Sequence, residues 1–345
     1  MAKPGPVCYL IAVPDQIGRN RISIIIPCFN EEAVLPELFE RVGYLAATWG
    51  LEPEIICVDD GSRDRTWELL LAQNQKDPRW RCLRFARNFG HQIAVSAGLF
   101  YADGDAVVVM DADLEDPPEE IPRLLEKWRA GYDVVYAIRQ NRKEGWVKRL
   151  CYWGFYRVMA RLVSFEIPLD TGDFCLLSRR VVETINGMPE RNRFVRGLRA
   201  WSGFQQTGIA YERAARFAGA TKYSFGKLLK LATDGLFSFS TVPLRVATWL
   251  GLWVSALAFF GVVFTLAQKI FSTQFERIGL KPSAGFPTIM ISILFLGGVQ
   301  LVCLGILGEY IGRIYEEVKG RPLWILRDSA GIAARDRKMT GAPGA

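Results

Sequence analysis

A chain of 345 residues, half of them hydrophobic, is too long for one small domain and has room for a soluble domain with an apolar appendage. Its net charge of +7 is compatible with nucleic-acid binding, but the basic residues concentrate beside the apolar stretches, which suits anionic headgroups or a phosphate-bearing substrate, so we expect no nucleic-acid partner. The seven cysteines are odd in number and lack C-x-x-C spacing, which excludes a paired zinc motif and predicts reduced packing residues in a reducing compartment.

Strands and helices alternate along the first half of the chain, after an N-terminal extension at residues 1–20. Hydrophobic periodicity predicts strands over residues 21–27, 54–58, 82–85, 106–110 and 133–137, and helices over residues 31–49, 66–75, 93–101 and 119–130. This alternation predicts an α/β fold with a mostly parallel sheet. Ligands bind beyond the carboxyl ends of the strands in such sheets, so the residues that follow each strand are the candidates for function.

The segments after the first two strands carry polar groups but no phosphate-binding glycine pattern. Residues 27–32 contain no glycine where a dinucleotide-binding G-x-G-x-x-G needs several, which excludes a nicotinamide enzyme of that type. Asp59 and Asp60, before Gly61 and Ser62, form a pair of carboxylates that could accept hydrogen bonds from a base N–H or from ribose hydroxyls. A turn with a helix cap at Ser62 or Asp64 is the alternative interpretation.

An acidic segment follows the strand predicted at residues 106–110. If the strand end is extended, Asp111, Asp113 and Glu115 point the same way, because side chains alternate with a period of two. Three oxygen ligands would then suit Mg²⁺ or Mn²⁺, completed by phosphate and water. The alternative is an acidic helix N-terminus capped by Asp113 or Asp116. Four carboxylates within six residues repel one another unless a cation intervenes, which favours the metal.

These segments together resemble a known family, the inverting glycosyltransferases of the second sequence family, which have a GT-A fold. Within it the chain is most similar to the polyisoprenyl-phosphate glycosyltransferases, above all the bacterial polyprenyl-phosphate glucosyltransferases with two C-terminal spans, and it is related to dolichyl-phosphate mannose synthase. The matching motifs lie at residues 24–31, 58–62, 87–91, 111–118, 172–174, 216–223 and 308–313. The resemblance implies a Rossmann-like GT-A catalytic domain at residues 21–222.

The resemblance also implies roles for single residues. The donor nucleotide would be contacted by Pro27, Phe29, Asn30, Glu31, Asp59, Asp60, Arg87, Asp111 and Ala112. Among these, Asp59 would contact the base and Asp111 the ribose and phosphate side, while Asp113 would ligate the metal. Two positions depart from the usual pattern: Glu115 stands where the family has Gln, and Phe29 stands where Tyr is common.

The chemistry of a lipid phosphate acceptor calls for cations. A phosphate monoester carries about −1.5 to −2 charges at pH 7, so it arrives as a nucleophile and needs relief from repulsion by the anionic donor. Arginine suits this task because its planar fork binds phosphate oxygens in pairs. The candidates are Arg139, Arg142, Arg213, Arg216 and Lys222. Each could instead be a solvated charge or one that faces lipid headgroups.

Two carboxylates flank Thr171 and Gly172 in a predicted turn, and the resemblance places the second of them in the acceptor region. We expect Asp173, with Asp170 nearby, to position the acceptor or to remove a proton from a monoprotonated phosphate. A structural turn is the alternative. His91, the only histidine, either contacts phosphate together with Asn88 or is a hydrogen-bonded structural imidazole.

The C-terminal third is predicted to lie in a membrane. Residues 246–266 and 286–307 carry no charge, and each run reaches the roughly 20 residues that a spanning helix needs. They predict a two-helix transmembrane region at 244–312, preceded by juxtamembrane amphipathic helices at 223–243 and followed by a tail at 313–345. The basic flanks place both ends on the cytoplasmic face of the inner membrane. Residues 144–165 predict a further interfacial helix, and the glycines at 297, 298, 305 and 308 would permit a homo-oligomer.

The function predicted from these features is the transfer, with inversion, of a hexosyl group from a UDP-sugar, best glucose, to polyisoprenyl (undecaprenyl) phosphate. Transfer of mannose or aminoarabinose to a dolichyl or polyprenyl phosphate is an alternative. A processive polysaccharide synthase is disfavoured, because residues 197–201 lack the glutamine of its Q-x-x-R-W motif and two spans make a poor channel. A non-catalytic membrane scaffold that has kept the fold is the alternative from another class, and it would have lost the metal carboxylates.

Overall fold

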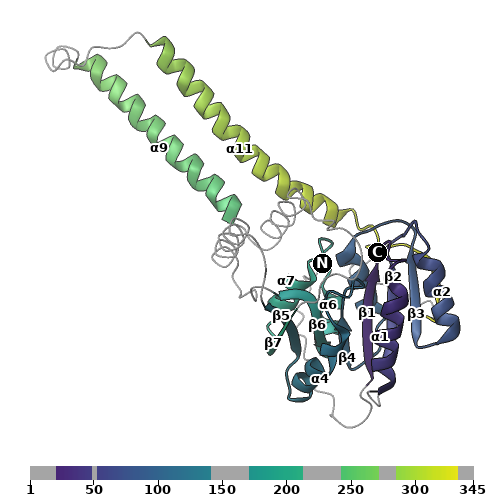
Figure 1. Ribbon diagram of the computed structural model, residues 1–345. Helices are drawn as coiled ribbons and strands as arrows, with labels where there is room; N and C mark the ends of the chain where they lie inside the picture. The colour runs from purple at the N-terminus through teal and green to yellow at the C-terminus, as the bar shows by residue number, and fades with distance from the viewer. Residues whose placement is uncertain (1–20, 49–52, 141–170, 213–241, 272–284, 333–345) are drawn as a thin grey trace, which may run out of the picture. The chain divides into compact units, whose positions relative to one another are not determined.

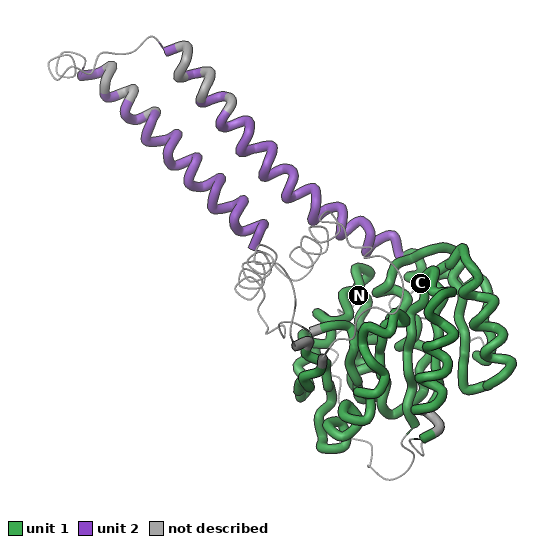
Figure 2. The backbone as a smooth tube through the Cα atoms, in the orientation of Figure 1, with its two compact units in different colours: residues 1–160, 165–224, 321–345 green, residues 161–164, 225–320 purple. Residues whose placement is uncertain are grey.

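The computed structural model describes residues 21–48, 53–140, 171–212, 242–271 and 285–332. The chain divides into two compact units (Figure 2). One comprises residues 1–160, 165–224 and 321–345 and contains an eight-stranded sheet. The other comprises residues 161–164 and 225–320 and contains two long helices.

The elements of the sheet unit are shown in Figure 1. Its strands are β1 (Ile22–Cys28), β2 (Pro53–Asp59), β3 (Trp80–Phe85), β4 (Ala106–Val109), β5 (Val134–Gln140), β6 (Thr171–Ser178), β7 (Gln206–Glu212) and β8 (Leu326–Ala330). Its helices are α1 (Leu35–Thr48), α2 (Thr66–Lys76), α3 (His91–Tyr101), the 3-10 turn η1 (Pro118–Glu120), α4 (Ile121–Arg129), α6 (Arg179–Gly187) and α7 (Val195–Trp201).

The strand order β7-β5-β6-β4-β1-β2-β3-β8 identifies where a ligand should bind. The strands β3, β2, β1 and β4 run parallel to one another, and β1 pairs with both β2 and β4. The chain therefore builds outward in opposite directions from β1, and the carboxyl ends of β1 and β4 enclose the topological switch point. The predicted α/β fold with a mostly parallel sheet is confirmed; β6 lies antiparallel between β4 and β5, and β8 is an antiparallel edge strand.

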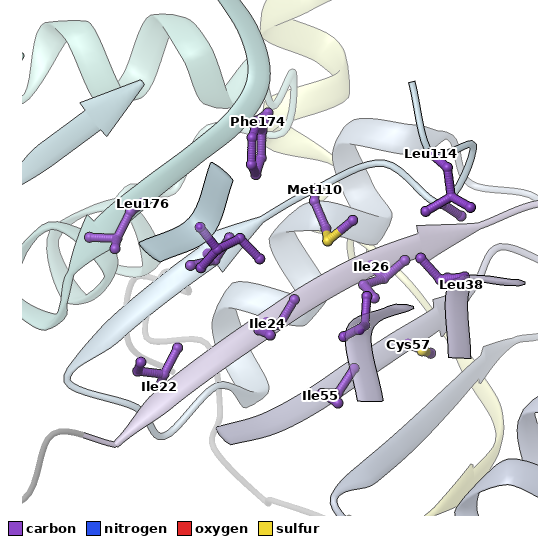
Figure 3. Packing of buried hydrophobic residues seen from close by; sticks show 14 of the residues in the cluster. Ile22, Ile24, Ile26, Leu38, Ile55, Cys57, Met110, Leu114, Phe174 and Leu176 are labelled. Carbon is purple, nitrogen blue, oxygen red and sulfur yellow. The ribbon is translucent and has the colours of Figure 1, made fainter. Parts of the chain in front are cut away.

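Helices cover both faces of the sheet because β1 is apolar on both sides. Ile24 and Ile26 belong to a core formed with α1, α2 and α4, which Figure 3 shows together with Met110, Leu114 and Phe174. Helices α3 and α6 cover the opposite face. There a Cβ on Gly98 of α3 would overlap the side chain of Ile25, so α3 lies closer to β1 than any larger residue would allow.

The described elements lie close to those predicted, and the departures have local causes. The helix expected from residue 31 begins at Leu35, because the residues before it form a turn whose Glu31 N–H donates to Thr66 Oγ1 at 2.8 Å. The helix expected over 119–130 is divided into η1 and α4. The strand expected to end at residue 110 stops at Val109, and the one expected to end at residue 137 continues to Gln140.

The second unit consists of α9 (Val242–Ile270) and α11 (Phe286–Val318), which contain both predicted apolar runs. Val242–Gly261 and Phe295–Val318 are long and apolar enough to cross a membrane. Large side chains such as Trp253 and Leu257 are more than 70% exposed, which a core helix of a soluble protein would not tolerate in series. The helices contact each other, and Cys303 Sγ lies 3.7 Å from the carbonyl oxygen of Ala247.

Candidate active site

The loops after β1 and β2 hold each other in place. Asn30 has a left-handed backbone, with φ of 54°, which is uncommon outside glycine and is most readily adopted by Asn and Asp. Its N–H donates to Ser62 Oγ at 2.9 Å, and its Oδ1 accepts from the N–H of Arg63 at 2.9 Å. This reciprocal pair joins the two predicted nucleotide-binding loops at one edge of the sheet.

Asp59 ends β2 and is fully buried. Its Oδ1 accepts the N–H of Ser62 at 2.9 Å, while Oδ2 lies 3.3 Å from Arg84 Nε and makes no hydrogen bond in the described part of the chain. Burial raises the pKa of Asp59, and the hydrogen bonds from Ser62 and the charge of Arg84 oppose that rise. One oxygen thus shapes the turn, and the other is an acceptor with capacity for a ligand N–H.

Asp60 faces a different way from Asp59. Its two oxygens accept the backbone N–H groups of Phe89 at 2.6 Å and Gly90 at 2.9 Å, so it organises the loop before α3. Gly61 makes this approach possible: its φ is 70°, and a Cβ there would lie 2.6 Å from the backbone carbon of Arg87. The Arg87 guanidinium lies over the Phe89 ring at 4.1 Å. Nucleotide contacts by Asp60 and Arg87 remain predictions.

The acidic segment after β4 is a turn, so the expected period-two alignment of three carboxylates is wrong. β4 ends at Val109, and Leu114 takes a left-handed backbone with φ of 56° while its side chain packs in the core (Figure 3). The left-handed backbone of Leu114 bends the chain while its side chain stays in the core. Within the turn, Asp113 Oδ1 accepts the N–H of Glu115 at 3.2 Å. Glu115 is buried, whereas Asp111 and Asp113 are partly exposed. Within the described ranges no three acidic, cysteine or histidine side chains are grouped as a metal site.

Asp111 is opposite Asp173 because of the antiparallel pairing of β4 with β6. Val109 is in register with Cys175, so the residues two positions beyond each, Asp111 and Asp173, meet at the carboxyl end of β4. His91, at the start of α3, lies between them: its Nε2 is 3.1 Å from Asp173 Oδ2 and 3.6 Å from Asp111 Oδ1. The structure therefore joins three residues that were predicted separately.

Asp173 is held by two further side chains. Arg196 of α7 donates through Nε to Oδ1 at 2.6 Å and through Nη2 to Oδ2 at 3.1 Å. Gln92 Nε2 donates to Oδ2 at 3.3 Å, and Gln92 Oε1 accepts the N–H of Val195 at 2.9 Å. A carboxylate held this way has a fixed position, and these contacts attach α7 to the start of α3.

The charges of this cluster shift one another's protonation. Burial acts to lower the pKa of His91, but Asp111 and Asp173 outweigh it and raise that pKa to about 9. Burial raises the pKa of Asp111 to about 6, against the attraction of His91. Burial acts to raise the pKa of Asp173, yet Arg196 and His91 hold it well below its usual range. At pH 7 His91 is a cation and Asp173 a weakly basic carboxylate, which favours positioning over proton removal.

The other predicted residues divide by location. Pro27 lies in β1 in register with Val58, and Phe29 is the first residue after that strand. Ala112 is buried in the acidic turn. Arg139 lies on β5 in register with Tyr211. Outside the described residues are Asp170, Arg142, Arg213, Arg216, Lys222, the interfacial helix expected at 144–165 and all but the last two residues of the juxtamembrane segment expected at 223–243.

Residues that sequence reasoning missed all act through long-range contacts. Arg84, Gln92 and Arg196 contact Asp59 or Asp173, and the Tyr211 hydroxyl donates to the buried carboxylate of Asp116. The contact with Tyr211 gives Asp116 a structural role, in place of the helix cap considered from the sequence. Of these residues, Arg84 could have been suggested by the sequence, because it lies one residue before the carboxyl end of β3, where ligands bind in such sheets.

Comparisons with known proteins agree with this architecture. The family model described as glycosyl transferase family 2 matches residues 23–185, and that described as the GtrB C-terminal hairpin matches residues 242–314. A protein of Synechocystis sp. described as an uncharacterized glycosyltransferase is 46% identical over 312 residues, covering 90% of this chain and 96% of that protein.

Two further relatives carry more specific names. The SfII prophage-derived bactoprenol glucosyl transferase of Shigella flexneri is 44% identical over 311 residues, covering 90% of this chain and 98% of the relative. The prophage bactoprenol glucosyl transferase homolog of Escherichia coli is 43% identical over 309 residues, covering 89% and 98%. With such identity over nearly the whole length, the chain belongs to glycosyl transferase family 2.

Proposed function

We propose that the protein transfers a glucosyl group from UDP-glucose to a polyisoprenyl phosphate, with inversion, at the cytoplasmic face of the membrane. The observation that carries the proposal is that Asp59 ends β2 while Asp111 and Asp113 follow β4, and that these two strands flank β1 and run parallel to it. The names of the Shigella and Escherichia relatives support glucose as the sugar and a bactoprenol lipid as the acceptor.

The donor half of the site fits a uridine nucleotide and a divalent cation. The buried Asp59 Oδ2 is an acceptor suited to a base N–H. Asp111 Oδ1 is buried and makes no hydrogen bond within the described residues, and Asp113 lies two positions on, so hard oxygens suited to Mg²⁺ or Mn²⁺ are present at this turn. A cation held by Asp111 and Asp113, with Glu115 as a candidate third ligand, would neutralise charge on the departing diphosphate.

The residues of the chain itself supply charge and position. His91 lies between Asp111 and Asp173, at the edge where the anionic donor and the anionic acceptor must approach each other. Asp173, fixed by Arg196, keeps the imidazole ring in place. The acceptor phosphate carries about −1.5 to −2 charges, so it attacks without a strong base. We also propose that basic side chains contact the acceptor phosphate, the candidates being Arg139, Arg142, Arg213, Arg216 and Lys222.

Two features support the proposed placement of the sheet on one side of the membrane: the two candidate spans, and the course of the chain before the first span and after the second. The sheet precedes α9, and β8, which follows α11, pairs with β3 of the same sheet. If both helices cross the bilayer, the chain returns to the side on which the sheet lies. The basic residues that flank the spans favour the cytoplasmic side.

The test is lipid labelling by the purified full-length protein. We expect UDP-[¹⁴C]glucose, Mg²⁺ or Mn²⁺ and undecaprenyl phosphate to give labelled, solvent-extractable lipid, and omission of the lipid phosphate to give none. A panel with UDP-galactose, GDP-mannose and UDP-aminoarabinose decides between glucose and the alternative sugars. Absence of labelled lipid with every donor would contradict transferase activity and favour the scaffold alternative.

A further inference from the structure

The last described strand, β8, comes from beyond the second candidate span. It pairs antiparallel with β3 at the edge of the catalytic sheet, with Asp328 in register with Arg84. Arg84 is in turn in register with Asp59 of β2. Residues in register on neighbouring strands point to the same face, so Asp59, Arg84 and Asp328 form one row across three strands.

Arg84 is the centre of this row. Its Nε lies 3.3 Å from Asp59 Oδ2, its Nη1 lies 3.9 Å from Asp328 Oδ2, and its guanidinium stands over the Trp67 ring at 5.5 Å. Asp59 Oδ2 is the oxygen assigned above to the nucleotide base. An arginine attracted by two carboxylates is less able to move fully onto one of them, so Asp328 helps to keep Asp59 Oδ2 available.

A second set of contacts leads from the same segment to Asp60. The N–H of Ala86 donates to the carbonyl of Ile325 at 2.9 Å. The Trp324 ring stacks on Phe85 with centroids 6.4 Å apart, and Phe85 meets Phe89 edge-to-face at 5.6 Å. The N–H of Phe89 is the group that Asp60 accepts. The segment 324–328 thus contacts side chains that lie next to Asp59, the last residue of β2, and next to the loop held by Asp60.

Protection of an exposed sheet edge is the simpler explanation for β8. Edge protection requires backbone pairing alone, and any side chains that permit a strand would serve. It does not account for a carboxylate in register with the arginine that contacts Asp59, or for an aromatic ring stacked on Phe85, which in turn contacts Phe89.

We propose that β8 is a positioning element of the donor site: Asp328 shares Arg84 with Asp59, Trp324 supports the Phe89 loop, and nucleotide affinity therefore depends on a strand supplied from beyond the membrane helices. This inference rests on the proposed function, since it assumes that Asp59 binds the donor base. Asp328 and Trp324 are proposed to act through Arg84 and Phe85, so their effect should fall on donor affinity and not on the acceptor.

The experiment measures UDP binding to the full-length protein in detergent, with Mn²⁺, by titration calorimetry. Asp328→Asn should weaken UDP binding about two- to fivefold, as expected from loss of a half-exposed ion pair, and Asp328→Glu should restore it. Trp324→Ala should weaken it about tenfold. In an Arg84→Gln background Asp328→Asn should have no further effect on UDP binding, because Asp328 is proposed to act through Arg84. Ser329→Ala is the matched control, because Ser329 lies on the same strand in register with Leu83 on the other face.

Steady-state kinetics provide the readout that a purely structural strand would not give. KM for the UDP-sugar should rise by the factor seen for UDP binding, while KM for the lipid phosphate and kcat stay within twofold. If β8 only stabilised the fold, the variants would lower the unfolding temperature but leave both the UDP affinity of the folded protein and its donor KM unchanged.

The outcomes separate the two proposals. A wild-type protein that binds no UDP would refute the donor assignment and this inference with it. UDP binding by the wild type, with equal affinity in the folded Asp328→Asn protein, would refute only the role of β8. Asp328 is half exposed, so its replacement should leave the fold intact even if Trp324→Ala does not fold.

Discussion

Arg196 donates to both carboxylate oxygens of Asp173, at 2.6 and 3.1 Å, across an interval of 23 residues. This bidentate pair explains why Asp173 is a poor base, because the guanidinium favours the charged form of the carboxyl group. It also explains why the carboxylate can orient His91, whose Nε2 lies 3.1 Å away. An ion pair therefore organises the part of the site that we propose for the acceptor.

Replacing Arg196 by Ala should lower kcat about a hundredfold, since a misplaced Asp173 would no longer hold His91 at the reacting edge. Arg196→Lys should have intermediate activity, because a lysine keeps the charge but loses the fork. Steady-state transfer to undecaprenyl phosphate measures both variants. Arg129→Ala, on the exposed last turn of α4, should behave as wild type. Full activity of Arg196→Ala would contradict the positioning role.

Replacing Asp113 by Ala should lower transfer about a thousandfold or more. The metal ion would lose a ligand, and the departing diphosphate would lose charge stabilisation by the metal that is worth several kcal/mol. Mn²⁺ titration of the purified protein should show weakened binding in the same variant. Glu126→Ala, an exposed carboxylate on α4, is the control. Unchanged turnover and unchanged Mn²⁺ affinity in Asp113→Ala would remove the metal assignment.

His91 should give the metal-free protein a stability component that alkali removes. Its pKa rises from about 6.5 in the unfolded chain to about 9 in the fold, so the imidazolium stabilises the native state fully below pH 6.5. This component is lost as pH rises through 9. Asp111, with a pKa of about 6, and Asp173, with a lowered pKa, titrate below that window. Arg196 stays charged throughout.

Thermal unfolding in detergent with EDTA checks this pH dependence. The unfolding temperature of wild type should exceed that of His91→Gln at pH 6.5, and the difference should shrink by pH 9.5. A difference that stays constant between these pH values would show that His91 does not carry the charge assigned to it.

Replacing Gly98 by Ala should destabilise the protein by about 1–3 kcal/mol, because the new methyl group would overlap Ile25 in a tightly packed layer. Gly187→Ala at the end of α6 provides a matched control, since a Cβ there would meet nothing within 4 Å. The free energy of unfolding reports both changes. In an Ile25→Ala background, which lacks the Cγ2 atom that the new Cβ would overlap, Gly98→Ala should cost less, and an unchanged cost would place the strain elsewhere.

Local pattern was enough to predict the elements from β1 to β5, because each strand is a short apolar run and each helix has its own periodicity. It also predicted that the residues after β1, β2 and β4 would share an edge, since parallel strands present their carboxyl ends together. The two apolar helices were equally readable, because the length and composition needed to span a bilayer are properties of a single segment.

Only the tertiary structure decided how these pieces combine. The turn at Leu114 depends on a core that buries its side chain, which no period along the segment reveals, so the alignment of Glu115 with Asp111 could not be excluded from the sequence. The pairing of Arg196 with Asp173 and of β8 with β3 joins residues far apart in the chain. Such contacts depend on which surfaces the packed sheet and helices bring together. The sequence by itself therefore determined which chemical groups lie at the sheet edge, and packing decided which of them hold one another in place.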